Sequence, residues 1–116
     1  MMLKDKEMLQ IAERYLKRLG ELGGESIEVM IRLDDIIKKT YGNIYRYNSK
    51  EYLLTGDFNK SLIGNAPFLV EKKDGRVVTF GTAARLEDYI RSYENGTMTP
   101  SLDLYWYPDE DRFDYK

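Results

Sequence analysis

Apolar side chains in the N-terminal segment recur with the period of an α-helix. Between Leu3 and Leu22 they fall three or four residues apart, and charges of both signs fill the remaining positions. The apolar stripe consists of Met8, Ala12, Tyr15, Leu16 and Leu19. The pattern predicts an amphipathic helix whose stripe faces the core. Gly20, followed by Gly23-Gly24, is expected to end it.

From Ser26 the period changes to two, which is typical of a β-strand. The alternation predicts a half-buried strand that continues to about Leu33. Residues 34–42 could extend this strand, form a bulge or form a turn, and we expect a loop. Aromatic and branched residues in the range 44–53 then predict a second long strand, interrupted near Asn48 or Ser49.

Residues 64–96 give the clearest pattern: a strand, a tight turn, a second strand and an amphipathic helix. The turn is Asp74-Gly75, a strong hairpin signal between strand-like runs. A two-residue loop would place Phe68 across from Gly81, whereas a three-residue loop places it across from Phe80. We expect the three-residue loop, because it gathers the large apolar side chains on one face of the hairpin. Its glycine can then adopt a positive φ.

The helix after this hairpin is expected to open near Thr82 and to end at Asn95-Gly96. Its apolar stripe consists of Leu86, Tyr89, Ile90 and Tyr93. The chain up to residue 96 is thus predicted to be one α+β domain. It has a single antiparallel sheet of about four strands in a meander, packed with an N-terminal helix and a helix after the last hairpin.

Four short motifs in this region carry a family resemblance. They are LLTGD at 53–57, GNAP at 64–67, LVEKKDGRVVTFGTA at 69–83 and LEDYI at 86–90. In this order they resemble the YrhB-like immunity-protein domain of bacterial polymorphic toxin systems, over the range from Tyr52 to Glu94. The resemblance implies a small cytoplasmic α+β protein that binds and neutralises a toxin without catalytic residues. It marks as fold-shaping positions Gly56, Gly64, Asn65, Pro67, Asp74, Gly75 and Gly81.

The amino-acid composition limits the reactions and binding partners that this chain can have. The 116 residues include no Cys and no His, which excludes thiolate nucleophiles, imidazole metal sites and His-activated hydrolases. A net charge of −2 gives no general attraction to nucleic acid or to anionic membranes. No apolar run approaches the ~20 residues of a membrane span, and the N-terminus lacks a secretion signal. We expect a cytoplasmic protein with no cofactor and no metal. The sequence allows a homo-oligomer but does not indicate one.

The remaining segment, residues 97–116, is an aromatic and acidic C-terminal extension. Between Pro100 and Lys116, five acids against two bases give a charge of −3, which leaves the first 99 residues at +1. The candidate partner-binding residues are Tyr105, Trp106, Tyr107, Asp109, Glu110 and Asp111. One interpretation is a structural strand with a solvated end. The other is an aromatic anchor with an acidic rim that fits a basic toxin surface.

A competing surface is the side of the sheet expected to be exposed, where Tyr45, Tyr47 and Glu71 would lie. Three functions from different classes remain open. The first is a non-catalytic immunity protein whose partner is a cognate toxin. The second is a small chaperone-like or stress protein that binds apolar client segments. The third is an enzyme using carboxylates such as Asp34 and Asp35, although adjacent acids after a strand more often form a solvated turn.

Overall fold

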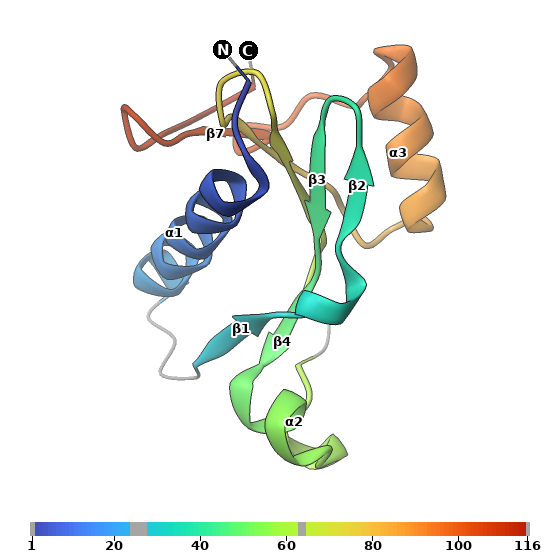
Figure 1. Cartoon of the computed structure of the whole chain (residues 1–116). Coiled ribbons are helices and arrows are strands. Elements are labelled where there is room, and N and C mark those ends of the chain that lie inside the picture. The colour runs from blue at the N-terminus through green and yellow to red at the C-terminus, as the bar shows by residue number, and fades with distance from the viewer. Residues whose placement is uncertain (1, 24–27, 63–64, 116) are drawn as a thin grey trace.

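The computed structural model of the chain describes residues 2–23, 28–62 and 65–115 (Figure 1). The helices are α1 (Asp5–Gly23), α2 (Lys50–Thr55) and α3 (Leu86–Asn95), with two 3-10 helices, η1 (Leu33–Asp35) and η2 (Phe58–Lys60). The strands are β1 (Val29–Ile31), β2 (Ile37–Lys39), β3 (Gly42–Tyr45), β4 (Tyr47–Ser49), β5 (Phe68–Glu71), β6 (Val77–Thr79), β7 (Tyr105–Tyr107) and β8 (Arg112–Asp114).

The strands of the described residues form two antiparallel sheets. Six of them follow the order β2-β3-β5-β6-β7-β8, and β1 pairs separately with β4. The predicted α+β class agrees with this, but the prediction of a single sheet of about four strands is wrong. Residues 37–39, expected in a loop, form β2. The C-terminal segment supplies β7 and β8, because Tyr105 pairs with Val78 across a long stretch of chain that local periodicity cannot reveal.

Helices cover both faces of the six-stranded sheet. Figure 1 shows α1 and α3 on opposite sides of it. The stripe of α1 packs with Phe68, Val70 and Trp106 on one face, and α3 packs with Leu69 and Phe80 on the other. Burial of each large side chain contributes roughly 1.5 to 3 kcal/mol. Because helices cover both faces, the central strands bury consecutive residues instead of alternating ones.

The register of the β5–β6 hairpin differs from the expected one. Phe68 lies opposite Thr79, and Leu69 lies opposite Val78, so the loop spans residues 72–75 and the three-residue prediction is wrong. The prediction assumed that only one face of the hairpin is apolar, whereas both are covered. The positive φ of Gly75 is confirmed, at 81°. A Cβ there would also lie 2.6 Å from the Ile11 side chain.

Helix α1 agrees with its predicted stripe, and it ends at Gly23, the second of the two expected stops, instead of at Gly20. Met8, Ala12, Tyr15 and Leu16 are buried, and Leu19 packs against them. The helix runs through Gly20 to Gly23. A glycine inside a helix costs only about 1 kcal/mol relative to alanine, which the packing of the stripe can offset. None of the helices in the described ranges is long and apolar enough to cross a membrane.

Helix α2 occupies part of the second predicted long strand. Ser49 ends β4 and caps the helix, since its side chain accepts a hydrogen bond from the Tyr52 backbone N–H at 3.0 Å. Gly56, with φ of 76°, ends α2 in the left-handed conformation. A capping serine thus overrides the strand propensity of the tyrosine and leucines that follow it.

Helix α3 begins later than predicted. Its first residue is Leu86 and its N-cap position is Arg85, without a side-chain cap, so the expected opening near Thr82 is wrong. The predicted stop is confirmed, because Gly96 adopts a φ of 70° and its N–H bonds to helix carbonyls. Gly64 of the GNAP motif and Gly24 lie outside the described residues.

Candidate partner-binding surface

Strands β7 and β8 position the candidate residues of the C-terminal segment. Trp106 pairs with Phe113, and Tyr107 pairs with Arg112, so the connecting residues form an exposed hairpin tip. Pro108 at the start of this tip is buried, and its carbonyl accepts a hydrogen bond from the Arg14 guanidinium at 3.1 Å. The hairpin is therefore anchored to α1.

Alternation along β7 sends its three aromatic side chains to different places. Trp106 is 2% exposed, with its ring centroid 5.8 Å from that of Tyr15. Its indole N–H donates to Asp111 at 2.9 Å. Tyr105 packs with the α3 side of the sheet, and Tyr107 is half-buried. The indole thus belongs to the core and holds the hairpin in place.

The three candidate acids are exposed at the hairpin tip but differ in their partners. Asp111 lies 3.1 Å from the Arg18 guanidinium besides accepting from the indole. Glu110 accepts from Arg112 at 2.5 Å. The hydrogen bond with Glu110 raises the pKa of Arg112, which also bonds to Asp114. Among the described residues, Asp109 has no ion-pair partner.

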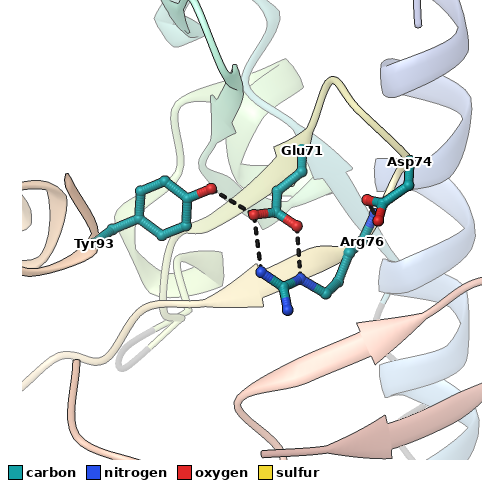
Figure 2. Close-up of polar contacts among 4 residues, drawn as sticks. All are labelled: Glu71, Asp74, Arg76 and Tyr93. Atoms are coloured by element: carbon teal, nitrogen blue, oxygen red, sulfur yellow. Dashed lines mark hydrogen bonds and ion pairs between the residues drawn. The ribbon is translucent and has the colours of Figure 1, made fainter. Parts of the chain in front are cut away.

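A second polar cluster lies on the hairpin of β5 and β6 (Figure 2). The Arg76 guanidinium donates to both oxygens of Glu71, at 2.6 and 3.0 Å, and the Tyr93 hydroxyl donates to the same carboxylate. The guanidinium carbon also lies 3.9 Å from the centroid of the Tyr105 ring. We call these residues, Glu71, Arg76, Tyr93 and Tyr105, the Glu71 cluster.

The Glu71 cluster is partly shielded from water, with the Glu71 and Arg76 side chains 12% and 25% exposed. Burial, followed by the hydrogen bond to Glu71, raises the pKa of Tyr93. Burial lowers the pKa of Arg76, but its hydrogen bonds with Glu71 and Tyr107 outweigh this effect and raise the pKa overall. The cluster thus joins β5, β6, α3 and β7 through groups that satisfy one another.

The residues of the competing surface expected from the sequence, Tyr45, Tyr47 and Glu71, do not lie together on an exposed face. Tyr45 is 1% exposed, Tyr47 packs against the α1 cluster, and Glu71 is engaged as described. In the described part of the chain both faces of the six-stranded sheet carry packed side chains, so these three residues do not share an exposed face. Sequence reasoning missed the Glu71 cluster because Tyr93 was counted only as an apolar stripe residue. The available signal was Tyr93 in the apolar stripe of a helix that follows a hairpin carrying charges of both signs.

Three of the positions expected to shape the fold, Asn65, Pro67 and Gly81, lie where β4, the GNAP segment and the start of α3 meet. Asn65 donates a side-chain hydrogen bond to the Tyr47 carbonyl. A Cβ on Gly81 would lie 2.5 Å from the Tyr89 hydroxyl, which accepts from the Ala83 N–H at 3.1 Å. Asp74 accepts from the Arg76 N–H in the hairpin turn. In the described part of the chain, no three acidic side chains gather as a metal ion would need.

Comparison with known proteins adds the decisive observation. A family model described as Immunity protein 35 matches residues 6–92. The chain belongs to the Immunity protein 35 family. The chain is also 32% identical over 87 residues to the uncharacterized protein YrhB of Escherichia coli strain K12, an alignment that covers 75% of this chain and 90% of that protein. No solved structure matches.

Membership of the Immunity protein 35 family confirms the resemblance drawn from the sequence motifs. The matched range is wider than the one those motifs cover, since it includes most of α1 together with β1 to β4. It ends within α3, before β7 and β8. The hairpin with the three candidate acids therefore lies outside the part of the chain that the family model matches.

Proposed function

We propose that this protein is a non-catalytic immunity protein that acts in the bacterial cytoplasm by direct contact with a cognate toxin of a polymorphic toxin system. The observation that carries the proposal is the family match over residues 6–92. The absence of Cys and His from the sequence supports action by binding, because it excludes the commonest nucleophile and general-base pairs. Family membership alone does not define the partner.

The acidic tip of the β7–β8 hairpin is the contact surface that we propose. Asp109 and Glu110 are exposed on a hairpin that is anchored by the buried Trp106 and Pro108, and an anchored surface would lose little entropy on binding. Carboxylates there would attract a basic toxin surface and speed its association. The neighbouring Tyr107, not the buried indole, would supply the aromatic contact.

Co-expression tests the function. The toxin gene immediately upstream of this reading frame, if there is one, is expressed with and without the immunity protein in the same host. We expect restored growth and a stable stoichiometric complex on gel filtration. Growth that stays arrested, or purified partners that elute separately at micromolar concentration, would contradict the proposal. An isolated reading frame with no toxic neighbour would count against it.

Point substitutions test the proposed surface better than truncation, because truncation after Thr99 would remove two strands of the sheet. We expect the double variant Asp109→Asn, Glu110→Gln to slow association with the toxin roughly tenfold at low salt and to flatten its salt dependence. The matched control is Glu13→Gln, Glu51→Gln, which removes the same charge from exposed positions elsewhere. Equal association rates for both double variants, measured by stopped flow, would exclude the hairpin tip.

One observation favours the second candidate function, a chaperone-like role. Leu54 and Phe58 are 66% and 80% exposed on neighbouring elements, α2 and η2, and exposed apolar groups of this size can bind client segments. This function predicts that the protein suppresses aggregation of unrelated unfolding proteins and that Leu54→Ser, Phe58→Ser abolishes the suppression. Lack of suppression at equimolar protein would dispose of it.

A further inference from the structure

A cavity of about 430 Å³ lies where the β1–β4 ladder, the GNAP segment and the first turn of α3 meet. Two arginines, Arg32 and Arg46, line it together with Asn48 and Asn65. Three fold-shaping positions of the family resemblance, Asn65, Pro67 and Gly81, belong to the same wall. The cavity therefore lies within the range that the family model matches, residues 6–92.

The two arginines are neighbours across the β1–β4 ladder. The Arg32 N–H donates to the Arg46 carbonyl at 2.9 Å, which continues the pairing of Ile31 with Tyr47. Like charges that face each other across strands destabilise a sheet. An anion between them would turn this repulsion into attraction.

The hydrogen-bonding capacity of both arginines is also incompletely used. The Nε atom of each is buried and has no hydrogen-bond partner in the described part of the protein. Arg46 lies 3.5 Å from Asp35 through a terminal nitrogen, and Arg32 forms no ion pair among the described residues. A buried donor without an acceptor costs roughly 1 to 3 kcal/mol. Such a group in a native fold calls for an explanation.

The cavity wall is held in a fixed shape. Asn48 accepts hydrogen bonds from the backbone N–H groups of Ser49 and Leu62, each at 2.7 Å. The hydrogen bond from Asn65 to the Tyr47 carbonyl fixes the opposite segment. Two guanidinium groups on such a wall form a preorganised site, because neither strand has to move for an anion to bind.

We propose that this cavity binds the carboxylate of an aspartate or glutamate side chain of the toxin. The planar guanidinium matches a carboxylate in shape and hydrogen-bonding pattern. Two arginines and Glu87 line the cavity, and Asp35 lies 3.5 Å from Arg46. Little net positive charge remains, which suits a singly charged carboxylate better than a doubly charged phosphate. The inference rests on the proposed toxin-binding function and gives that partner an acidic side chain that inserts beside Arg32 and Arg46.

Affinity of the toxin complex is the first test. We expect Arg32→Met and Arg46→Met each to weaken the complex about 30-fold or more. The control is Arg91→Met on α3, whose side chain is 69% exposed and which is expected to change affinity less than twofold. If wild-type protein binds the toxin and Arg32→Met binds equally well, the cavity is not the site, although the proposed function stands. If wild-type protein forms no complex, the proposed function itself fails.

A second test identifies the source of the carboxylate. Toxin acids are changed one at a time to their amides, and one such change should weaken binding to wild-type protein but not weaken binding to Arg32→Met further. Propionate and inorganic phosphate are also titrated while the Arg32 and Arg46 Nε–H resonances are followed by NMR. Propionate binding with an unchanged toxin affinity for Arg32→Met would mean a free carboxylate ligand and overturn the assignment. Phosphate binding at lower concentration than propionate would overturn it as well.

Discussion

The Glu71 cluster and the Arg32–Arg46 cavity are two groups of charged side chains that differ in whether their hydrogen bonds are met within the chain. In the Glu71 cluster, a carboxylate accepts from Arg76 and Tyr93, and an aromatic ring covers the guanidinium. In the cavity, two arginines are neighbours across the β1–β4 ladder, and their Nε atoms have no hydrogen-bond partner among the residues that the structure describes. A cluster that satisfies itself stabilises the fold, whereas one that does not is poised to bind another molecule.

The largest expected loss of stability comes from Trp106, which is 2% exposed and packs in the core between α1 and the sheet. Trp106→Ala should lower the free energy of unfolding by about 3 to 5 kcal/mol, because a buried indole is replaced by a cavity. Trp106→Phe keeps most of the packing but loses the hydrogen bond to Asp111, and we expect about 1 to 2 kcal/mol. Urea denaturation measures both. Equal stability of Trp106→Ala and wild type would show that the indole is not in the core.

Breaking the Glu71 cluster should have the next largest effect. Arg76→Gln leaves the Glu71 carboxylate, which is 12% exposed, without its charge partner, and we expect a loss of about 3 kcal/mol in the free energy of unfolding. Lys73→Gln on the same hairpin is the control, since Lys73 is exposed, and should change stability by less than about 0.5 kcal/mol. Similar denaturation midpoints for the two variants would contradict a structural role for the cluster.

Sequence patterns predicted the locally determined parts of this fold. The α1 stripe, the positive φ at Gly75 and the stop at Gly96 each depend on residues a few positions apart. The sequence allowed a strand at β7 but not its pairing with the distant β6. Strands β2 and β8 pair with their sequence neighbours β3 and β7, but each has only three residues, too few for a clear alternating pattern. The register of β5 and β6 was misjudged because coverage of both sheet faces by α1 and α3 is a property of the whole fold.

The candidate sites also divide into features that depend on nearby residues and features that depend on the whole fold. The exposed acids 109–111 were identifiable from composition, but the burial of Trp106 depends on α1, which is far away in the sequence. The Arg32–Arg46 pair was not identified, because the two residues come from separate segments, just after β1 and just before β4, and neither belongs to a recognisable motif. Their relation appears only when the β1–β4 ladder brings them together.

Alkaline titration probes a buried polar contact between α1 and the sheet. The Tyr15 and Thr79 hydroxyls are 3.2 Å apart, and burial raises the pKa of Tyr15 from 10.0 to about 12. Because the folded-state pKa lies above the unfolded one, the protonated tyrosine stabilises the fold fully below pH 10. That stabilisation is lost as the pH rises through 12.

The wild-type protein should therefore lose about 2 to 3 kcal/mol more than Tyr15→Phe between pH 9 and pH 12. At pH 7, Tyr15→Phe should cost about 1 kcal/mol, since only the hydrogen bond to Thr79 is lost. Denaturant melts at the two pH values give both quantities. Parallel pH profiles for the two proteins would show that Tyr15 is not shielded from water.

The smallest change in stability is expected for Arg32→Met in the Arg32–Arg46 cavity. If Arg32 and Arg46 stabilised the fold as Arg76 does, Arg32→Met would cost several kcal/mol. We expect instead that the free energy of unfolding stays within about 0.5 kcal/mol of wild type or increases, because the substitution removes a like-charge neighbour and an unpaired buried donor while keeping the apolar stem. Urea melts of Arg32→Met beside Arg76→Gln decide the point. A loss for Arg32→Met as large as that for Arg76→Gln would make the arginine pair a structural element and remove the physical basis for a carboxylate site.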